Sequence, residues 1–120
     1  FQGMPAYSAS KLMNVLFTRA LAKRLDGTGV TANCLHPGVI GSEFAQDEPG
    51  LLKTLMKIAK PILMSPEDGA KTSIYLASSP DVATISGEYF LACKPKQPSR
   101  RARNDDDAER LWQLSESWMP

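Results

Sequence analysis

The sequence predicts an α/β fold in which strands pair side by side in a parallel sheet. Three features support this prediction: a long helical run over residues 6–25, a Gly-rich break at residues 26–29, and a short apolar strand over residues 30–36. A helix that turns tightly into a strand covered on both faces is the second half of a crossover unit, and crossover units connect parallel strands.

The composition fits one folded domain without a strong charge bias. The chain has 120 residues, of which 42% are apolar, and 14 basic against 13 acidic residues give a net charge of +1. This balance gives no electrostatic reason to expect a nucleic acid partner. Cys34, Cys93 and the single histidine, His36, are too scattered to predict a metal site, and the two thiols are expected to be buried and reduced. No apolar run reaches the roughly 20 residues that span a bilayer.

The first helix carries a polar stripe on an otherwise apolar surface. Apolar side chains over much of its circumference predict burial on more than one side. The stripe contains Tyr7, Lys11, Asn14 and Thr18. Tyr7 and Lys11 are one helical turn apart, so they lie on the same face. A fixed cation favours the phenolate, so this tyrosine could act as an acid or a base. The spacing alone is weak, because an ordinary surface pair looks the same.

The loop at residues 37–42 follows the strand directly. Ligands bind at the carboxyl ends of parallel strands in doubly wound sheets. Gly38 and Gly41 allow a ligand to approach the backbone closely. A loop that only connects the strand to the next element, without binding a ligand, explains these residues equally well at this point.

Residues 51–64 are expected to form a helix as far as Pro61. Its apolar face is opposed by Lys53, Lys57 and Lys60. A basic amphipathic helix can lie on a membrane surface, but a lid or surface helix is the favoured interpretation because only three lysines contribute.

The remaining elements follow from capping and turn residues. Residues 65–68 have the Ser, Pro and acids of a helix start, and this helix should end near Ser78 with Ala70, Ile74 and Ala77 inward. Residues 86–93 predict a turn and a strand, and residues 94–101 an extended surface tail. A short helix from residue 105 should then dock through Leu111, Leu114 and Trp118, with Trp112 flanking them.

Residues 27–32 match the Gly-x-Gly-x-x-Gly/Ala dinucleotide pattern, but the match is misleading. That pattern must follow a strand and open a helix, because the pyrophosphate binds at the N-terminus of the helix. Here a helix ends and a strand begins.

With these elements placed, the chain resembles the short-chain dehydrogenase/reductase family. The resemblance depends on Tyr7-Ser8-Ala9-Ser10-Lys11 at the start of a long helix and on Asn33-x-x-His36-Pro37-Gly38 after it. It covers about residues 4–93. Residues 11–18 and the tail over 102–112 look most like the retinol dehydrogenase branch.

The resemblance implies a role for each motif. Tyr7 would be the general acid/base, and Lys11 would bind the nicotinamide ribose and favour the phenolate. Ile40 would act through its backbone, Ser42 stands where the family usually has Thr, and residues 42–64 would form a substrate lid. The implied cofactor is NADP or NAD, with NADP favoured, and the residues expected to contact it are Tyr7, Lys11, Pro37, Gly38, Val39, Ile40 and Ser42.

The resemblance also implies an incomplete unit. The glycine-rich nucleotide loop and catalytic serine of the family are absent from these residues. We therefore expect the C-terminal portion of a doubly wound, Rossmann-type domain over residues 1–93, a tail over 94–120, and no activity of the isolated chain. The expected whole is an intracellular oxidoreductase, cytoplasmic or associated with the endoplasmic reticulum, that acts on a retinol/retinal-like alcohol or carbonyl. The alternative is a non-catalytic chain that pairs through its first helix, as a homodimer would; membrane association stays open.

Overall fold

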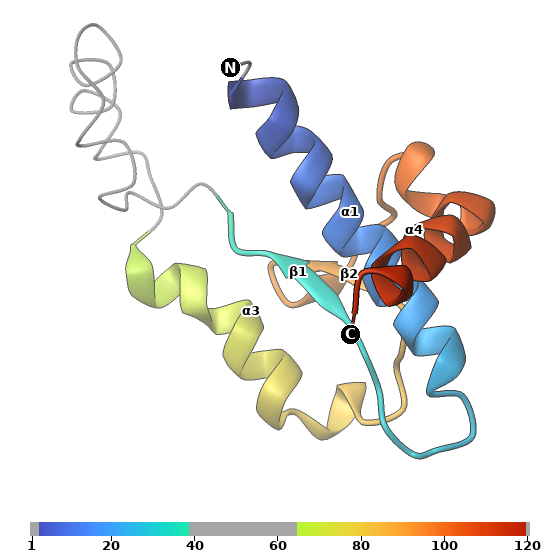
Figure 1. Cartoon of the computed structure of the whole chain (residues 1–120). Helices are drawn as coiled ribbons and strands as arrows, with labels where there is room; N and C mark the ends of the chain where they lie inside the picture. Colours follow the sequence, from blue (N-terminus) through green and yellow to red (C-terminus); the bar gives the residue numbers. More distant parts are fainter. Residues whose placement is uncertain (1–2, 39–64, 120) are drawn as a thin grey trace, which may run out of the picture.

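The computed structural model describes residues 3–38 and 65–119, and Figure 1 shows their arrangement. The helix expected over 51–64 lies outside these residues. The elements, in chain order, are α1 (Gly3–Arg24), β1 (Cys34–His36), α3 (Pro66–Ser78), the short turn η3 (Pro80–Val82), β2 (Tyr89–Leu91), β3 (Lys94–Pro95), the short turn η4 (Arg101–Arg103) and α4 (Asp105–Ser117).

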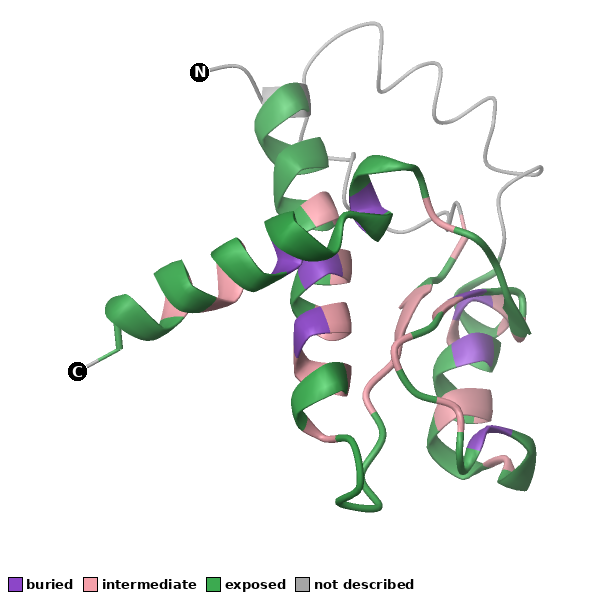
Figure 2. Ribbon diagram, turned by 90° about the vertical axis from the view of Figure 1, so that its right-hand side faces the viewer, coloured by how far each residue is buried: buried purple, intermediate pink, exposed green. Residues whose placement is uncertain are grey.

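The sheet has the order β1-β2-β3. β1 and β2 are parallel, with Leu35 opposite Phe90, and α3 forms the crossover between them. Figures 1 and 2 show α1 on one face of the sheet and α3 on the other, with α4 crossing α1 on the side away from the sheet. The predicted α/β fold with a parallel strand pair is therefore confirmed.

The third strand was not expected from the sequence. Ala92 and Cys93 have φ angles of 50° and 60°, and they reverse the chain so that Lys94–Pro95 pairs antiparallel with β2. Two-residue turns with positive φ match the twist of the strands that they join. The prediction of an extended tail from Lys94 is wrong at this point, because the turn returns the chain to the sheet.

α1 ends in the turn that the sequence predicted. Lys23 and Arg24 lie in its last turn, where cations suit the negative end of the helix dipole. Gly27 and Gly29 then take φ angles of 75° and 79°. Since these glycines leave a helix, they do not form a nucleotide-binding loop.

α3 begins and ends where its capping residues predict. The Ser65 hydroxyl accepts a hydrogen bond from the Asp68 backbone N–H at 3.1 Å, and Pro66 occupies the first helical position. The predicted inner face is wrong, since Ile74 is exposed while Gly69 and Thr72 are buried. Thr72 faces inward because its hydroxyl accepts a hydrogen bond from the Cys93 N–H at 3.2 Å.

α4 packs across α1 through small residues. Ala20 and Ala108 are only 1% and 2% exposed, and with Leu16 they form the buried centre of this contact (Figure 2). The expected contact through Leu114 and Trp118 is wrong: Trp118 is 80% exposed. Trp112, expected to flank the contact, takes part in it together with Leu12 and Leu111. Its ring stacks on the Phe17 ring with centroids 5.2 Å apart.

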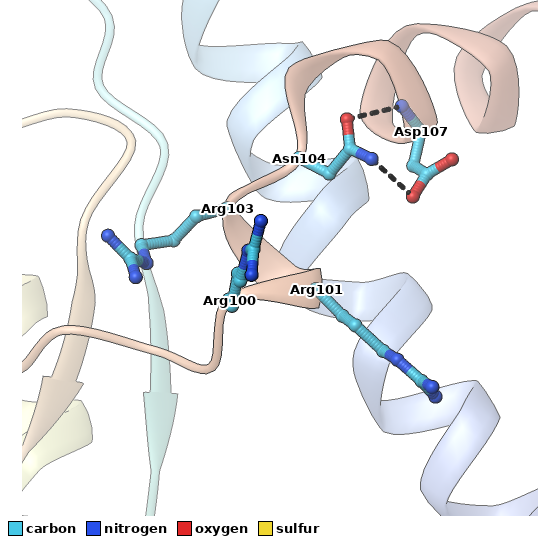
Figure 3. Close-up of a pocket in the computed structure, with 5 residues that line it drawn as sticks. All are labelled: Arg100, Arg101, Arg103, Asn104 and Asp107. Atoms are coloured by element: carbon cyan, nitrogen blue, oxygen red, sulfur yellow. Dashed lines mark hydrogen bonds between the residues drawn. The ribbon is translucent and has the colours of Figure 1, made fainter.

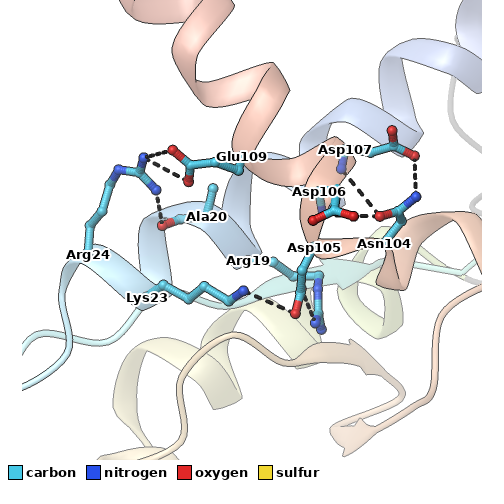
Figure 4. Close-up of polar contacts among 9 residues, drawn as sticks. All are labelled: Arg19, Ala20, Lys23, Arg24, Asn104, Asp105, Asp106, Asp107 and Glu109. Atoms are coloured by element: carbon cyan, nitrogen blue, oxygen red, sulfur yellow. Dashed lines mark hydrogen bonds and ion pairs between the residues drawn. The ribbon is translucent and has the colours of Figure 1, made fainter.

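Charged side chains hold the same two helices together (Figure 4). Asp105 accepts from Arg19 at 2.7 Å and pairs with Lys23 at 3.0 Å. Arg24 pairs with Glu109 at 2.9 Å, and its guanidinium lies 4.2 Å from the centre of the Trp112 ring. We call these contacts the helix clasp. Hydrogen bonds from α1 lower the pKa of both carboxyl groups.

The remaining face of α1 is open in the described structure. Tyr7, Lys11 and Asn14 on this face are exposed. The predicted burial on more than one side is met only in part: Leu16 and Ala20 are buried against α4, whereas Ala9, Met13 and Phe17 are exposed. No helix within residues 3–38 and 65–119 is long and apolar enough to cross a bilayer.

Candidate active site

The predicted reactive pair lies on one face of α1. The Lys11 ammonium nitrogen is 5.3 Å from the centre of the Tyr7 ring. Tyr7 is 49% exposed and Lys11 is exposed as well. Ser10, between them, donates its hydroxyl hydrogen to the Tyr7 carbonyl at 2.7 Å, which turns this hydroxyl to the backbone. A phenol and an ammonium are therefore close together where a ligand can reach both.

The second predicted motif follows β1. α1 and β1 run in opposite directions, so the start of α1 and the carboxyl end of β1 lie at the same end of the molecule (Figure 1). Gly38 has a φ of 88°, which glycine adopts without strain. Its N–H donates to Nδ1 of His36 at 2.9 Å, so the geometry assigns the proton of a neutral His36 to Nε2. Pro37 and Gly38 are therefore held in a fixed turn.

Three predicted cofactor contacts, Val39, Ile40 and Ser42, lie outside the described residues. The predicted lid over 42–64 lies outside them as well, and both stay predictions.

Asn33 of the second motif holds the strands in place. Its side-chain N–H donates to the Ile85 carbonyl at 2.6 Å, and its side-chain oxygen accepts from the Glu88 N–H at 3.1 Å. The Gly87 N–H also donates to the Ala32 carbonyl at 2.7 Å. These bonds hold residues 85–88, just before β2, beside residues 32–33, just before β1. The carboxyl ends of the two strands are therefore aligned at the edge where ligands bind in such sheets.

A pocket of about 230 Å³ lies at this edge. The pocket could not be predicted from the sequence, because it depends on the unexpected turn after β2 and on which face of α3 turns inward. The helix cap at Ser65 was the available signal, since the start of a crossover helix lies near the carboxyl end of the preceding strand. The pocket is lined by Pro37, Gly38, Asp68, Lys71, Thr72, Leu91, Ala92 and Cys93.

An ion pair lies at this pocket. The Lys71 ammonium is 2.6 Å from the Asp68 carboxylate. Hydrogen bonds from Lys71 and Ser65 hold the pKa of Asp68 below its ordinary value, and the same carboxylate raises the pKa of Lys71. The pocket therefore combines one fixed charge pair with the aliphatic side chain of Leu91.

The two thiols are free, but they are only partly buried, so the prediction that both are buried is wrong. Burial raises the pKa of Cys34, which keeps this thiol protonated at neutral pH. Among the described residues, no group of three or more His, Cys, Asp or Glu side chains is placed to hold a metal ion.

The fold and this edge define an α/β domain of the doubly wound class, with a Tyr-x-x-x-Lys helix beside a parallel strand. A short chain dehydrogenase model matches residues 1–50. The chain is 50% identical over 110 residues to retinol dehydrogenase 12 of Mus musculus and 46% identical over 113 residues to retinol dehydrogenase 14 of Homo sapiens. Each match covers 92% of this chain and 34% of the relative.

A third relative, dehydrogenase/reductase SDR family member 13 of Bos taurus, is 43% identical over 116 residues, which cover 95% of this chain and 31% of that protein. The chain belongs to the short-chain dehydrogenase/reductase family, and its similarity is to the retinol dehydrogenase branch. It spans about a third of the length of these relatives.

Proposed function

We propose that this chain is part of an NAD(P)-dependent oxidoreductase that interconverts an alcohol and a carbonyl in an apolar, retinoid-like substrate. The observation that carries the proposal is the 5.3 Å separation between the Lys11 ammonium and the Tyr7 ring on an exposed helix face. The names of the relatives, retinol dehydrogenase 12 and 14, support the substrate class.

Tyr7 and Lys11 would divide the proton chemistry between them. When bound, the nicotinamide cofactor supplies a hydride to the carbonyl carbon or accepts one from the alcohol. The Tyr7 hydroxyl gives its proton to the substrate oxygen during reduction and takes a proton from it during oxidation. The Lys11 ammonium has three N–H donors, so it can bond ribose hydroxyls while its charge stabilises the Tyr7 phenolate.

The turn after β1 would hold the nicotinamide end of the cofactor. Gly38 lacks a side chain and has a positive φ, which leaves room for close approach to the backbone. We propose that Pro37, Gly38, Val39, Ile40 and Ser42 contact the nicotinamide, as the family resemblance implies. Because the relatives are about three times as long as this chain, we propose that other residues of the polypeptide bind the adenosine half. NADP is favoured over NAD by resemblance only.

The experiment is Tyr7→Phe in the full-length polypeptide, assayed with retinaldehyde and NADPH. Loss of the proton donor should lower kcat by roughly a hundredfold or more while cofactor affinity stays within about twofold. Tyr75→Phe is the matched control, because that ring packs beside Phe90 at 6.4 Å, in a different part of the molecule from α1. Unchanged turnover of Tyr7→Phe would exclude Tyr7 from the chemistry.

A second candidate is a non-catalytic chain that pairs with another chain through α1. Met13 and Phe17 favour it, because they lie one turn apart and stay 49% and 41% exposed, which leaves apolar surface beside the α4 contact for a partner helix. It predicts that the 120-residue chain binds no NADPH above background and elutes as a defined dimer in size-exclusion chromatography. Tight, saturable NADPH binding by these residues alone would contradict this alternative.

A further inference from the structure

A run of basic residues follows the sheet and leads into α4. Residues 94–103 contain five basic side chains and no acidic one. All five are exposed. We call this set the basic strip, and its members are Lys94, Lys96, Arg100, Arg101 and Arg103.

The charges of the basic strip are not neutralised by the described residues. Within 3–38 and 65–119, none of the five side chains forms an ion pair or a hydrogen bond. Among the acidic residues that follow the strip, Asp105 pairs with Arg19 and Lys23 of α1, and Glu109 pairs with Arg24 (Figure 4). Asp106 and Asp107 pair with no cation of the described residues, and Asp107 lines the same hollow as the three arginines. The five cations of the strip outnumber these two nearby carboxylates, so the strip presents a net positive charge to the solvent.

The geometry of the strip does not favour a site for one small anion. Arg100, Arg101 and Arg103 line an open hollow of about 630 Å³ together with Asn104 and Asp107. Figure 3 shows the three guanidinium groups pointing in different directions rather than toward a common point. Side chains that diverge in this way suit anions that are spread over a surface.

We propose that the basic strip is a contact surface for the anionic headgroups of a lipid membrane. Clusters of four to eight Lys and Arg residues are typical of segments that bind phosphatidylserine-rich leaflets. Residues 94–103 contain no aromatic side chain on which a nucleic acid base could stack, which favours lipid over nucleic acid. The choice of lipid also rests on the proposed function, because a retinoid dissolves in membranes and an enzyme docked there meets its substrate directly.

The first measurement is sedimentation of the chain with vesicles. Vesicles of phosphatidylcholine mixed with phosphatidylserine should bind the chain, and vesicles of phosphatidylcholine alone should not. Binding should weaken steeply between low and physiological salt, because exposed charges are screened over about 8–10 Å. Equal binding to the two kinds of vesicle, or binding that is indifferent to salt, would overturn the proposal.

Two matched triple variants locate the contact. Changing Arg100, Arg101 and Arg103 together to Gln should reduce vesicle binding roughly tenfold or more, whereas changing the same three to Lys should keep it within about threefold. A loss in the Lys variant equal to that in the Gln variant would contradict a diffuse electrostatic contact. Arg110→Gln, on the exposed side of α4, is the single-charge control and should change binding much less.

The remaining outcomes separate the alternatives. Release from vesicles by millimolar inorganic phosphate would indicate a small-anion site, and tighter binding to single-stranded RNA than to vesicles would indicate nucleic acid; either overturns the proposal. Circular dichroism verifies that each variant keeps its helices. Vesicle binding needs no turnover, so its failure can be told apart from failure of the proposed oxidoreductase activity, which Tyr7→Phe tests in detergent solution.

Discussion

The two long sides of α1 differ in how much protein covers them. The side toward α4 holds the buried Leu16 and Ala20 and carries three cations of the helix clasp. The open side carries Tyr7, Lys11 and Asn14, all exposed. The helix clasp and the sheet hold α1 on its other sides. Its open side can therefore keep polar, reactive groups accessible. Stability and the candidate chemistry therefore depend on different residues of one helix.

The largest expected effect comes from Leu16→Ala. Leu16 is 6% exposed in the contact with α4, so truncating it loses buried apolar area and leaves a cavity. The free energy of unfolding should fall by about 2–3 kcal/mol, measured by urea denaturation followed by circular dichroism. Met13→Ala, about one turn earlier on the same face but 49% exposed, is the matched control and should cost less than about 0.5 kcal/mol. Equal losses would show that burial against α4 does not determine the cost of truncation.

The second prediction concerns the contact between Ala22 of α1 and Gly87, which lies just before β2. Gly87 has a φ of 81°, and an added Cβ would lie 3.3 Å from the Cβ of Ala22. Gly87→Ala should destabilise the chain by about 1–2 kcal/mol, from backbone strain and crowding together. Gly27→Ala has nearly the same φ, 75°, but its Cβ would meet no atom within 4 Å, so it isolates the strain. The two variants should therefore differ in the urea midpoint; identical midpoints would show that the Ala22 contact is unimportant.

The parts of the fold that short-range chemistry determines could be predicted from the sequence. Ser65 and Pro66 mark the start of α3, and the Gly27 and Gly29 turn marks the end of α1, because capping bonds and positive φ angles are local requirements. The closeness of Tyr7 and Lys11 also follows from helix geometry alone. Their catalytic roles stay predictions.

The parts that depend on distant contacts could not be predicted. The periodicity of α4 allows either Trp112 or Trp118 to dock, and the choice depends on where Ala20 and Ala108 let the helices approach. The pocket between Thr72 and Cys93 depends on a turn at Ala92, where the usual Asn or Gly signal is missing. Val39, Ile40 and Ser42 lie outside the described residues.

The third prediction tests the planar stacking within the helix clasp. Arg24→Lys keeps the positive charge but loses the guanidinium that lies 4.2 Å from the centre of the Trp112 ring and donates to the Ala20 carbonyl at 3.1 Å. The ring contact alone should account for about 0.5 kcal/mol, seen as a small fall in Tm. Arg110→Lys makes the same exchange on the exposed side of α4 and should leave Tm unchanged. A fall of the same size in both variants would assign the effect to helix propensity instead.

The smallest expected effect is the dependence of the helix clasp on pH. Hydrogen bonds from Arg19 and Lys23 lower the pKa of Asp105, and a hydrogen bond from Arg24 lowers the pKa of Glu109. A carboxyl group whose pKa is lower in the folded state stabilises the fold above its ordinary pKa, about 4, and this stability is lost as the pH falls through the folded-state pKa. The urea midpoint should therefore decrease slightly from about pH 6 to about pH 3. The effect is small because both carboxylates are about half exposed and screened by solvent.

Asp68 on α3 contributes in the same direction, because Lys71 and Ser65 lower its pKa too. A variant that combines Asp105→Asn with Glu109→Gln removes the clasp carboxylates and leaves Asp68 in place. It should start from a lower midpoint at neutral pH and lose less on acidification than the unaltered chain. If both proteins instead lose the same amount, the acid sensitivity belongs to Asp68 and the sheet, and α4 is held on α1 by its apolar contact alone.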